Sequence, residues 1–180
     1  AIQNMINLPK DDKVMAYVNT KDLKDEEYIN SHYIVMCTKK GVVKKTLLEQ
    51  YSRPRTNGIN AITIREGDQL LEAKMTTGNS QIMIAGKSGK SIRFEEEKVR
   101  SMGRTAAGVR GIRLADDNDE VVGMICIDNL ESSVLVVSEN GYGKRSAVED
   151  YRITNRGGKG VKTINITEKV KNPYRIYKPI

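Results

Sequence analysis

Basic residues recur beside glycines at a fixed spacing in this chain, and such pairs can bind phosphate groups. In the first kind of pair, a glycine is followed four positions later by a basic residue: Gly41 and Lys45, Gly89 and Arg93, Gly141 and Arg145. In the second kind, an arginine precedes a glycine by three or four positions: Arg55 and Gly58, Arg104 and Gly108, Arg156 and Gly160. Glycine lets the backbone approach a phosphate closely, and arginine and lysine supply positive charge. Because both kinds of pair return every 48 to 52 residues, they indicate a structural repeat.

Residues of catalytic and metal sites do not form comparable patterns. Residues 86–91 resemble the end of a phosphate-binding loop, but the glycine required five positions before Gly89 is Ile84. The acidic run 116–120 suggests a calcium loop, yet its sixth and twelfth positions would be apolar residues. His32 is the only histidine, so a catalytic dyad or a histidine-based metal site has no second member. We therefore expect no catalytic residue, no metal site, no cofactor and no enzymatic activity of this chain by itself.

The apolar residues of the repeat form short runs that are rich in β-branched residues. In the middle repeat these runs are Gln81–Ala85, Ser91–Phe94, Gly111–Leu114 and Val121–Ile127. Each run has the length of a strand, and none keeps a helical spacing of apolar residues for three turns. Four strands in a unit of about 50 residues predict an all-β, propeller-like fold of four-stranded blades. One turn of helix at residues 22–27 is the exception that we expect.

The repeat divides the chain, which we expect to form one domain over residues 1–180, into five segments. They are residues 1–30, the end of one blade and a linker; 31–77, 78–130 and 131–168, one blade each; and 169–180, a divergent tail. Lys13–Val18 is expected to hold the place that Gln69–Met75 holds in the next unit. A closed ring usually takes four to eight blades, so about three and a half blades predict a partial ring, either an open arc or part of a larger protein.

Positive charge is concentrated in the same parts of each repeat. Residues 39–60, 87–114 and 139–162 hold 20 Lys and Arg against 7 Asp and Glu, whereas the other residues hold 10 against 16. Equivalent positions of successive blades project in similar directions, so these charges should lie along one edge. Together with the net charge of +7, this pattern predicts an edge that binds a polyanion.

The composition is typical of a soluble domain with an aliphatic core. Hydrophobic residues make up 38% of the chain, tryptophan is absent and phenylalanine occurs once. No stretch approaches eighteen apolar residues and residues 1–10 lack the pattern of a signal peptide, so we expect an intracellular protein that does not enter a membrane. Cys37 and Cys126 lie in apolar runs and are expected to be buried rather than joined in a disulfide.

Three segments resemble a known family of bacterial proteins. Lys39–Thr46 (KKGVVKKT), Met102–Ile112 (MGRTAAGVRGI) and Glu139–Ser146 (ENGYGKRS) resemble, in order and spacing, the C-terminal domain of the A subunit of bacterial DNA gyrase. The resemblance extends from Ala1 to about Thr167. It implies a β-pinwheel, a propeller-like ring of six blades that exchange strands, with a basic rim that binds and wraps DNA. In that ring the chain would correspond to the end of the second blade, the third and fourth blades, and much of the fifth.

Asn155–Gly160 resembles the box of that family, Gln-Arg-Arg-Gly-Gly-Lys-Gly, with asparagine in place of the first arginine. The box belongs to the first blade of the family, so we interpret this segment as a related loop of a later blade. Its glycines can expose backbone N–H groups to a phosphate, while Arg156 and Lys159 supply charge. A β-turn that requires positive φ explains the same glycines, and the two interpretations are compatible.

The resemblance implies non-sequence-specific DNA binding, bending and wrapping, in support of negative supercoiling by an ATP-dependent type II topoisomerase. The implied partners are double-stranded DNA, the rest of the gyrase A subunit and the gyrase B subunit, in the bacterial cytoplasm at the nucleoid. ATP and magnesium would be used by other parts of the parent enzyme. The residues expected to contact DNA are Lys44, Lys45, Arg53, Arg55, Lys90, Arg93, Arg104, Arg110, Lys144, Arg145, Arg156, Gly157, Gly158 and Lys159.

Three other interpretations of the sequence are possible, and one feature of the chain argues against each of them. The related chain of topoisomerase IV shares the fold of this family, although its motifs are usually more degraded than those of this chain. A protein-interaction propeller similar to chromatin regulators would not require a basic residue at the same place in every blade. An enzyme with a cleft on the propeller axis would need convergent carboxylates or histidines, which the sequence lacks.

Overall fold

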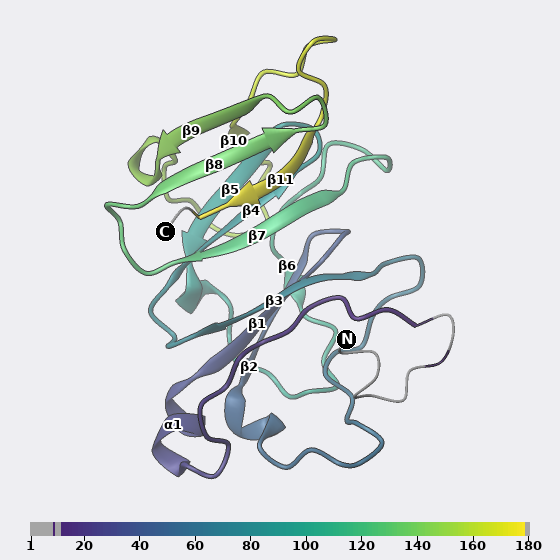
Figure 1. The fold of residues 1–180 in the computed structure, drawn as a ribbon, viewed down its shortest axis with the longest axis vertical. Helices are drawn as coiled ribbons and strands as arrows, with labels where there is room; N and C mark the ends of the chain where they lie inside the picture. Colours follow the sequence, from purple (N-terminus) through teal and green to yellow (C-terminus); the bar gives the residue numbers. More distant parts are fainter. Residues whose placement is uncertain (1–8, 10–11, 179–180) are drawn as a thin grey trace.

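The computed structural model describes residue 9 and residues 12–178, and its regular structure is mainly antiparallel β-sheet (Figure 1). In spatial order, the first sheet contains β3 (Leu70–Thr76), β1 (Tyr33–Thr38), β2 (Val42–Leu47) and β6 (Val109–Arg110). The second contains β7 (Val121–Ile127), β4 (Gln81–Gly86), β5 (Lys90–Glu95) and β10 (Val161–Lys162). The third contains β11 (Pro173–Tyr177), β8 (Ser133–Ser138) and β9 (Gly143–Ala147). We call these sheets the first, second and third blades, and they confirm the all-β, propeller-like fold.

Short helices follow one plan in each repeat. A single 3₁₀ turn follows the second strand of each blade: η2 (Leu48–Tyr51), η3 (Glu96–Lys98) and η4 (Val148–Asp150). The α-helix α1 (Glu26–Ser31) precedes β1 and begins where the side chain of Asp25 accepts a hydrogen bond of 3.1 Å from the backbone N–H of Tyr28. This N-cap places the helix four residues later than the turn expected at 22–27.

Each of the first two blades is completed by a strand from the following repeat. β6 pairs with β2, and β10 pairs with β5 in the same manner. The third strand of the middle repeat therefore lies at Val109–Arg110, not at the expected Gly111–Leu114. Gly108 makes this exchange possible because its φ is 94° and a side chain there would approach the carbonyl oxygen of Val43 to 2.7 Å.

The tail continues the repeat and does not diverge from it. β11 pairs with β8 as β3 pairs with β1 and β7 with β4, and these three strands begin 51 and 52 residues apart. Pro173 is the first residue of β11, where a missing N–H is tolerated in an edge strand. The spacing of the repeat alone would have predicted this strand, but the two prolines of the segment argued against it.

Apolar side chains pack between the blades. All six residues of β4 are buried, because this strand faces a neighbouring blade on each side. Ile82 and Ile84 belong to a core with Val35 of the first blade, whereas Met83 belongs to a core with Val134 of the third. Alternate residues of one strand thus serve two cores, which is the period-2 pattern of a sheet covered on both faces.

The cysteines are free, with Cys37 buried and Cys126 half-buried. Burial raises the pKa of the Cys126 thiol to about 12 and that of the Cys37 thiol further still. Neither thiol is therefore set up to react as a thiolate near neutral pH.

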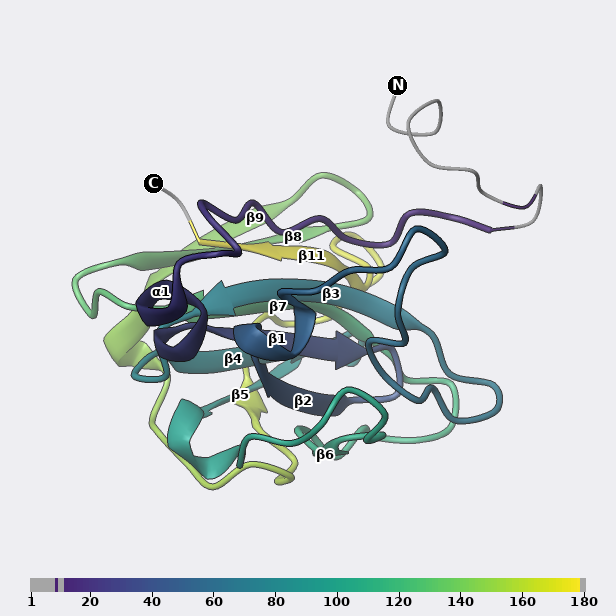
Figure 2. The same cartoon turned by 90° about the horizontal axis from the view of Figure 1, so that it is seen from below.

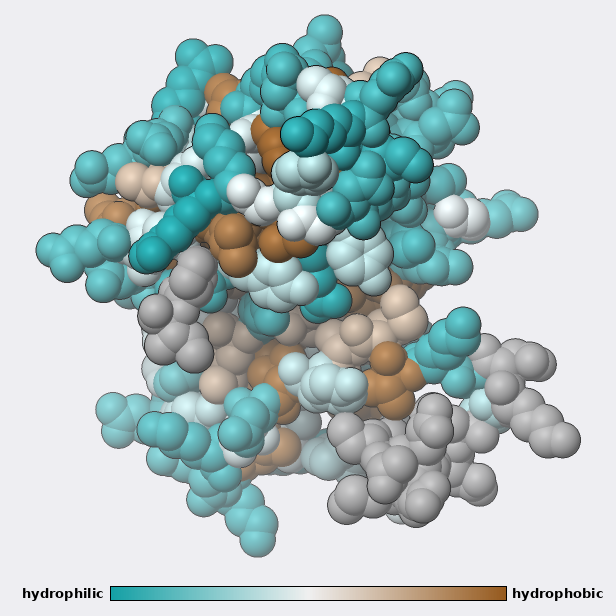
Figure 3. Space-filling model, turned by 45° about the horizontal axis from the view of Figure 1, so that its top comes forward, coloured by the Kyte–Doolittle hydropathy of each residue, from teal (hydrophilic) through white to brown (hydrophobic). Residues whose placement is uncertain are grey.

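The three blades turn the same edge toward a common axis. β7 contacts both β3 and β11, and these three strands lie together while β6 lies at the opposite edge (Figure 2). We call the β3, β7 and β11 side the inner edge and the β6 and β10 side the outer edge. The face of the third blade seen in Figure 3 is largely hydrophilic, with apolar side chains confined to small patches.

The segment before α1 lies against the first blade. Residues 13–18, which were expected at the place of the strand Gln69–Met75 in the next unit, form no strand, although Ala16 and Val18 pack against the core beneath α1. The remainder of the expected half-blade, residues 1–8 and 10–11, lies outside the described residues. In the described part of the chain, no helix is long and apolar enough to cross a membrane.

Candidate nucleic-acid interface

Three loops along the outer edge contain ten basic residues and no acidic residue. They are residues 53–64, 100–114 and 152–166, which follow η2, η3 and η4, and we call them together the outer belt. Its basic residues are Arg53, Arg55, Arg100, Arg104, Arg110, Arg113, Arg152, Arg156, Lys159 and Lys162. The ion pairs found among residues 9 and 12–178 include none of them. In the described part of the chain, no carboxylate therefore forms an ion pair with the basic residues of the outer belt.

Hydrogen bonds join the loops of the outer belt end to end. At the joint between residues 53–64 and 100–114, which we call the first joint, the Arg104 side chain donates to the carbonyl oxygen of Asn60 at 3.4 Å. At the second joint, between residues 100–114 and 152–166, Arg156 donates to the carbonyl oxygen of Arg110 at 3.1 Å. The two arginines hold equivalent places in the repeat. The outer belt is therefore one continuous structure across the blades.

The box-like loop is a tight turn that docks on the preceding loop. Gly157 has a φ of 79°, and its N–H donates to the carbonyl oxygen of Gly111 at 2.6 Å. Arg156 Nε donates to the carbonyl oxygen of Lys98 at 2.8 Å. The N–H of Gly157 is thus occupied within the protein, and the loop presents the exposed Lys159 outward instead. The turn interpretation of this segment describes its geometry better than an interpretation based on free backbone donors.

Most of the residues expected to contact DNA are accessible to solvent. The exposed ones are Arg53, Arg55, Arg110, Lys144, Arg145, Gly158 and Lys159. Those of intermediate exposure are Lys90, Arg104, Arg156 and Gly157. Lys144 and Arg145 lie on β9 and not on the outer belt. On β9, Arg145 Nε donates to the hydroxyl of Ser133 at 2.7 Å.

Three expected contact residues, Lys44, Lys45 and Arg93, are buried, and this corrects the expectation. Arg93 Nη1 donates to the carbonyl oxygens of Val148 and Tyr151, both at 2.7 Å. Lys45 Nζ lies 3.7 Å from the buried carboxylate of Glu96. The side chains of Lys45 and Arg93 therefore cross-link two successive blades and are not available to a phosphate outside the protein.

Burial also shifts the acid–base behaviour of two of these groups. It lowers the pKa of the Arg93 guanidinium, and it lowers the pKa of Lys44 to about 8, with a further contribution from the nearby positive charge of Arg104. Lys44 is fully inaccessible to solvent. Its ammonium group lies directly beneath the first joint, where it donates to the carbonyl oxygens of Ala61 and Arg104.

Four basic residues of the outer belt were not among those expected: Arg100, Arg113, Arg152 and Lys162. All four are exposed. Arg113 lines a groove of about 580 Å³ with Arg110 and Lys40, and the same groove is also lined by three aspartates: Asp116, Asp117 and Asp119. Arg113 does not recur in the repeat, since Thr63 and Asn165 hold the equivalent places in the other two units. The complete absence of acidic residues from these loops was the signal that could have found it.

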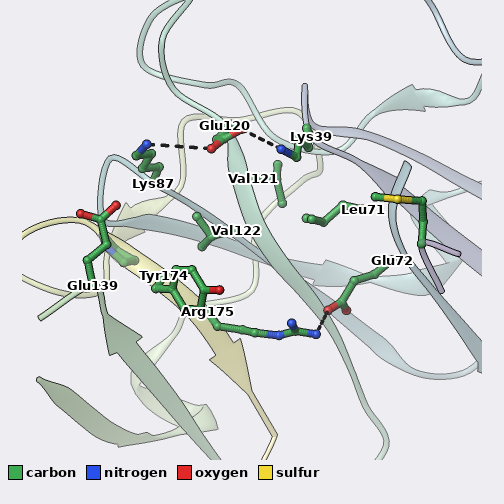
Figure 4. A pocket seen from close by; sticks show the side chains of 12 residues that line it. Lys39, Leu71, Glu72, Lys87, Glu120, Val121, Val122, Glu139, Tyr174 and Arg175 are labelled. Carbon is green, nitrogen blue, oxygen red and sulfur yellow. Dashed lines mark hydrogen bonds and ion pairs between the residues drawn. The ribbon is translucent and has the colours of Figure 1, made fainter. Parts of the chain in front are cut away.

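The inner edge has a different electrostatic character. A cavity of about 430 Å³ lies there, and its basic and acidic side chains pair with one another (Figure 4). Glu120 lies 3.5 Å from Lys39 and 3.9 Å from Lys87, and Arg175 lies 3.2 Å from Glu72. Lys39 and Lys87 of the repeated turns are therefore each paired with a carboxylate, unlike the basic residues of the outer belt. Among the described residues, no cluster of His, Cys, Asp and Glu could hold a metal ion.

Strand exchange between four-stranded blades and a basic outer belt together define a propeller domain of the β-pinwheel class. A family model, the DNA gyrase C-terminal domain (β-propeller), matches residues 32–76, 80–128 and 132–172, one match for each repeat. The chain is 46% identical over 172 residues to the DNA gyrase A subunit of Staphylococcus epidermidis (strain ATCC 12228) and 45% identical to that of Staphylococcus aureus (strain NCTC 8325). It belongs to the family of DNA gyrase C-terminal domains. Both alignments cover 95% of this chain and 19% of the relative, so the chain spans about a fifth of their length.

Solved structures share the same fold. The C-terminal domain of DNA topoisomerase IV superimposes with a TM-score of 0.88 at 23% identity, over 99% of this chain and 54% of that one. A DNA gyrase A C-terminal domain gives 0.82 at 23% identity, over 99% and 58% of the two chains. At these identities the likeness establishes the fold alone, and it agrees with the family resemblance of the sequence.

Proposed function

We propose that this chain binds duplex DNA along the outer belt without reading base sequence, as the DNA-binding domain of a DNA gyrase A subunit. The observation that carries the proposal is a belt of ten basic residues with no acidic residue, continuous across the blades. Lysine and arginine on such a surface neutralise phosphates and release the counterions condensed on DNA. The α-helix of the described residues, α1, has only six residues and contacts η2 and β2 of the first blade, which favours contacts to the DNA backbone over insertion of a helix into a groove.

Bending follows from the shape of the interface. Contacts spread over successive blades favour DNA that follows the outer belt, and they offset an elastic cost on the order of 1–6 kcal/mol for a few tens of base pairs. In the parent enzyme this would present a second segment of the same DNA molecule and support ATP-dependent negative supercoiling. The gyrase B subunit and the rest of the gyrase A subunit would be the partners, with ATP and magnesium bound there, in the bacterial cytoplasm at the nucleoid.

Two observations favour gyrase over topoisomerase IV as the parent enzyme. The chain is 45–46% identical to gyrase A subunits over nearly its whole length. In addition, the segment Asn155–Gly160 of its third repeat is identical at five of six positions to the last six residues of the gyrase box. Topoisomerase IV stays the second candidate because its C-terminal domain has the same fold.

The test is DNA binding measured by fluorescence anisotropy at several salt concentrations, with two duplexes of unrelated sequence. If about five phosphates are neutralised, log K should fall with log salt at a slope of roughly −4 to −5, equally for both duplexes. A slope near zero, or binding to only one duplex, would overturn the proposal. Bending is measured separately, as faster ligase-catalysed closure of DNA circles near the persistence length of about 150 bp.

A further inference from the structure

The buried ammonium group of Lys44 joins two loops of the outer belt from below. Lys44 lies on β2 at the outer edge of the first blade, and its Nζ donates to the carbonyl oxygen of Ala61 at 2.6 Å and to that of Arg104. Ala61 belongs to the loop that carries Arg55, and Arg104 belongs to the next loop. The Lys44 side chain therefore helps to set the relative position of two loops that present arginine to solvent, together with Thr63, whose hydroxyl donates to the carbonyl oxygen of Thr105 at 2.7 Å.

This buried charge has no carboxylate partner in the described part of the chain. The ion pairs there do not include Lys44, and the charged or titratable groups that face it are Arg104 from the belt and Tyr51 from η2. Tyr51 donates its hydroxyl proton to the same carbonyl oxygen of Ala61, at 3.1 Å. A buried ammonium group without a counter-ion is costly to stability. Negative charge brought to the first joint from outside would lower that cost.

The second joint shows that the fold does not require this lysine. Three positions after its glycine, the second repeat has Ile92 where the first has Lys44. Ile92 is buried beneath the box-like loop, and a side chain at Gly158 would lie 3.5 Å from its Cδ1. In the third repeat Lys144 reaches the carbonyl oxygen of Thr163 at 3.4 Å, which repeats the contact of Lys44 with Ala61. A lysine thus holds this place in the first and third repeats, and the second joint shows that an aliphatic residue can hold it as well.

We propose that Lys44 is a positioning residue for DNA binding, which fixes the spacing of the Arg55 and Arg104 loops and whose buried charge is favoured by bound phosphates. The inference rests on the proposed function of the outer belt. Its consequence is reciprocal: if bound DNA favours the protonated amine, protonation favours DNA by the same factor. Because burial and Arg104 lower the pKa of Lys44 to about 8, this linkage falls in a range where DNA binding can be measured.

The experiment compares the wild-type chain with Lys44→Ile, the residue that the second joint uses, and with Lys74→Gln, which removes an exposed charge on the inner edge. We expect Lys44→Ile to fold and to bind DNA about threefold to tenfold more weakly at pH 7, with an unchanged salt slope. Between pH 7 and 9.5 the wild-type affinity should fall about threefold more than that of Lys44→Ile, as a half-unit rise in pKa on binding requires. Lys74→Gln should keep the wild-type pH profile.

Two results would overturn the inference while leaving the proposed function intact. The first is wild-type affinity and pH profile in Lys44→Ile. The second is a salt slope reduced by about 0.9, which would indicate direct contact with a phosphate. Titration of wild-type Lys44 by NMR, with and without a short duplex, decides the matter even if the variant fails to fold: the pKa must rise when DNA binds, and an unchanged pKa refutes the linkage. A wild-type chain that shows no salt-dependent binding would instead refute the proposed function.

Discussion

Arg93 donates a hydrogen bond of 2.7 Å to the carbonyl oxygen of Val148, across the boundary between the second and third blades. The same nitrogen donates to Tyr151, and Nε donates to the side chain of Gln81 at 2.7 Å. Lys45 reaches the carbonyl oxygen of Glu96 across the preceding boundary, at 3.3 Å. The basic residue that marks the repeat therefore acts as a cross-link between successive blades.

The variant Arg93→Met should lower the free energy of unfolding by about 3 kcal/mol, because it leaves buried carbonyl groups without a donor. Urea denaturation measures the loss. The matched control is Arg145→Met, since Arg145 holds the same place in the third repeat but is exposed and should cost less than about 1 kcal/mol. Equal losses in the two variants would contradict the cross-linking role of Arg93.

Substitution of exposed residues of the outer belt should weaken DNA binding and leave the stability of the chain nearly unchanged. Arg55→Gln, Arg110→Gln and Lys159→Gln should each weaken DNA binding and reduce the magnitude of the salt slope by about 0.9, for every phosphate contact that is lost. The melting temperature should hardly change, because isolated exposed charges contribute little to stability. Lys74→Gln, on the inner edge, provides a charge-matched control whose salt slope should stay at the wild-type value. If all four variants weaken binding equally, net charge alone controls binding.

Arg156 should show both kinds of effect. Two of its nitrogens donate to the carbonyl oxygens of Lys98 and Arg110, while the residue keeps intermediate exposure. We expect Arg156→Gln to cost about 1 kcal/mol of stability and also to reduce the salt slope. Parallel urea and anisotropy measurements separate the two effects. A loss of affinity with wild-type stability would show that these hydrogen bonds contribute nothing to the fold.

Gly58 and Gly108 hold equivalent places in the repeat and offer a matched comparison. Gly108→Ala should destabilise the chain by at least about 3 kcal/mol, because φ is 94° and the new methyl group would collide with Val43. Gly58→Ala should cost only about 1 kcal/mol, since φ is 76° there but no atom lies within 4 Å of the new group. Thermal melts of both variants test the difference. Equal destabilisation would mean that backbone strain alone controls both positions.

The stability of the chain should increase in mildly alkaline solution through Lys44. Its pKa is about 8 in the folded state against an ordinary value of 10.5, so between these values the unfolded chain binds more protons than the folded chain. The free energy of unfolding therefore rises with pH across this interval. Urea midpoints of the wild type and Lys44→Ile, compared from pH 7 to 10, should show this rise in the wild type alone. A difference that does not vary with pH would contradict the lowered pKa.

The repeat in the sequence predicted which residues hold equivalent places, but it did not predict whether their side chains are buried between blades or exposed to solvent. The 48 to 52 residue spacing of glycines was enough to predict three blades, the fold class and a basic edge. The spacing could not predict that Arg93 is buried between two blades while Arg104 is accessible to solvent, because the gap between two blades exists only after the sheets have packed. The strand expected at 111–114 was misplaced for a similar reason: strand exchange is a pairing between repeats, and a pattern within one repeat contains no information about it.

The exchange of β6 into the first blade also affects the order in which the chain can fold during synthesis. Until Arg110 has left the ribosome, β2 has no neighbour on its outer side, and an open strand edge of this kind can pair with another unfinished chain. Lys44 and Lys45 lie in the middle of β2, and they are accessible to water before the second repeat covers them. Charged residues on an open edge oppose such pairing between chains. We therefore expect the lysines that are buried in the finished domain to oppose aggregation of the nascent chain.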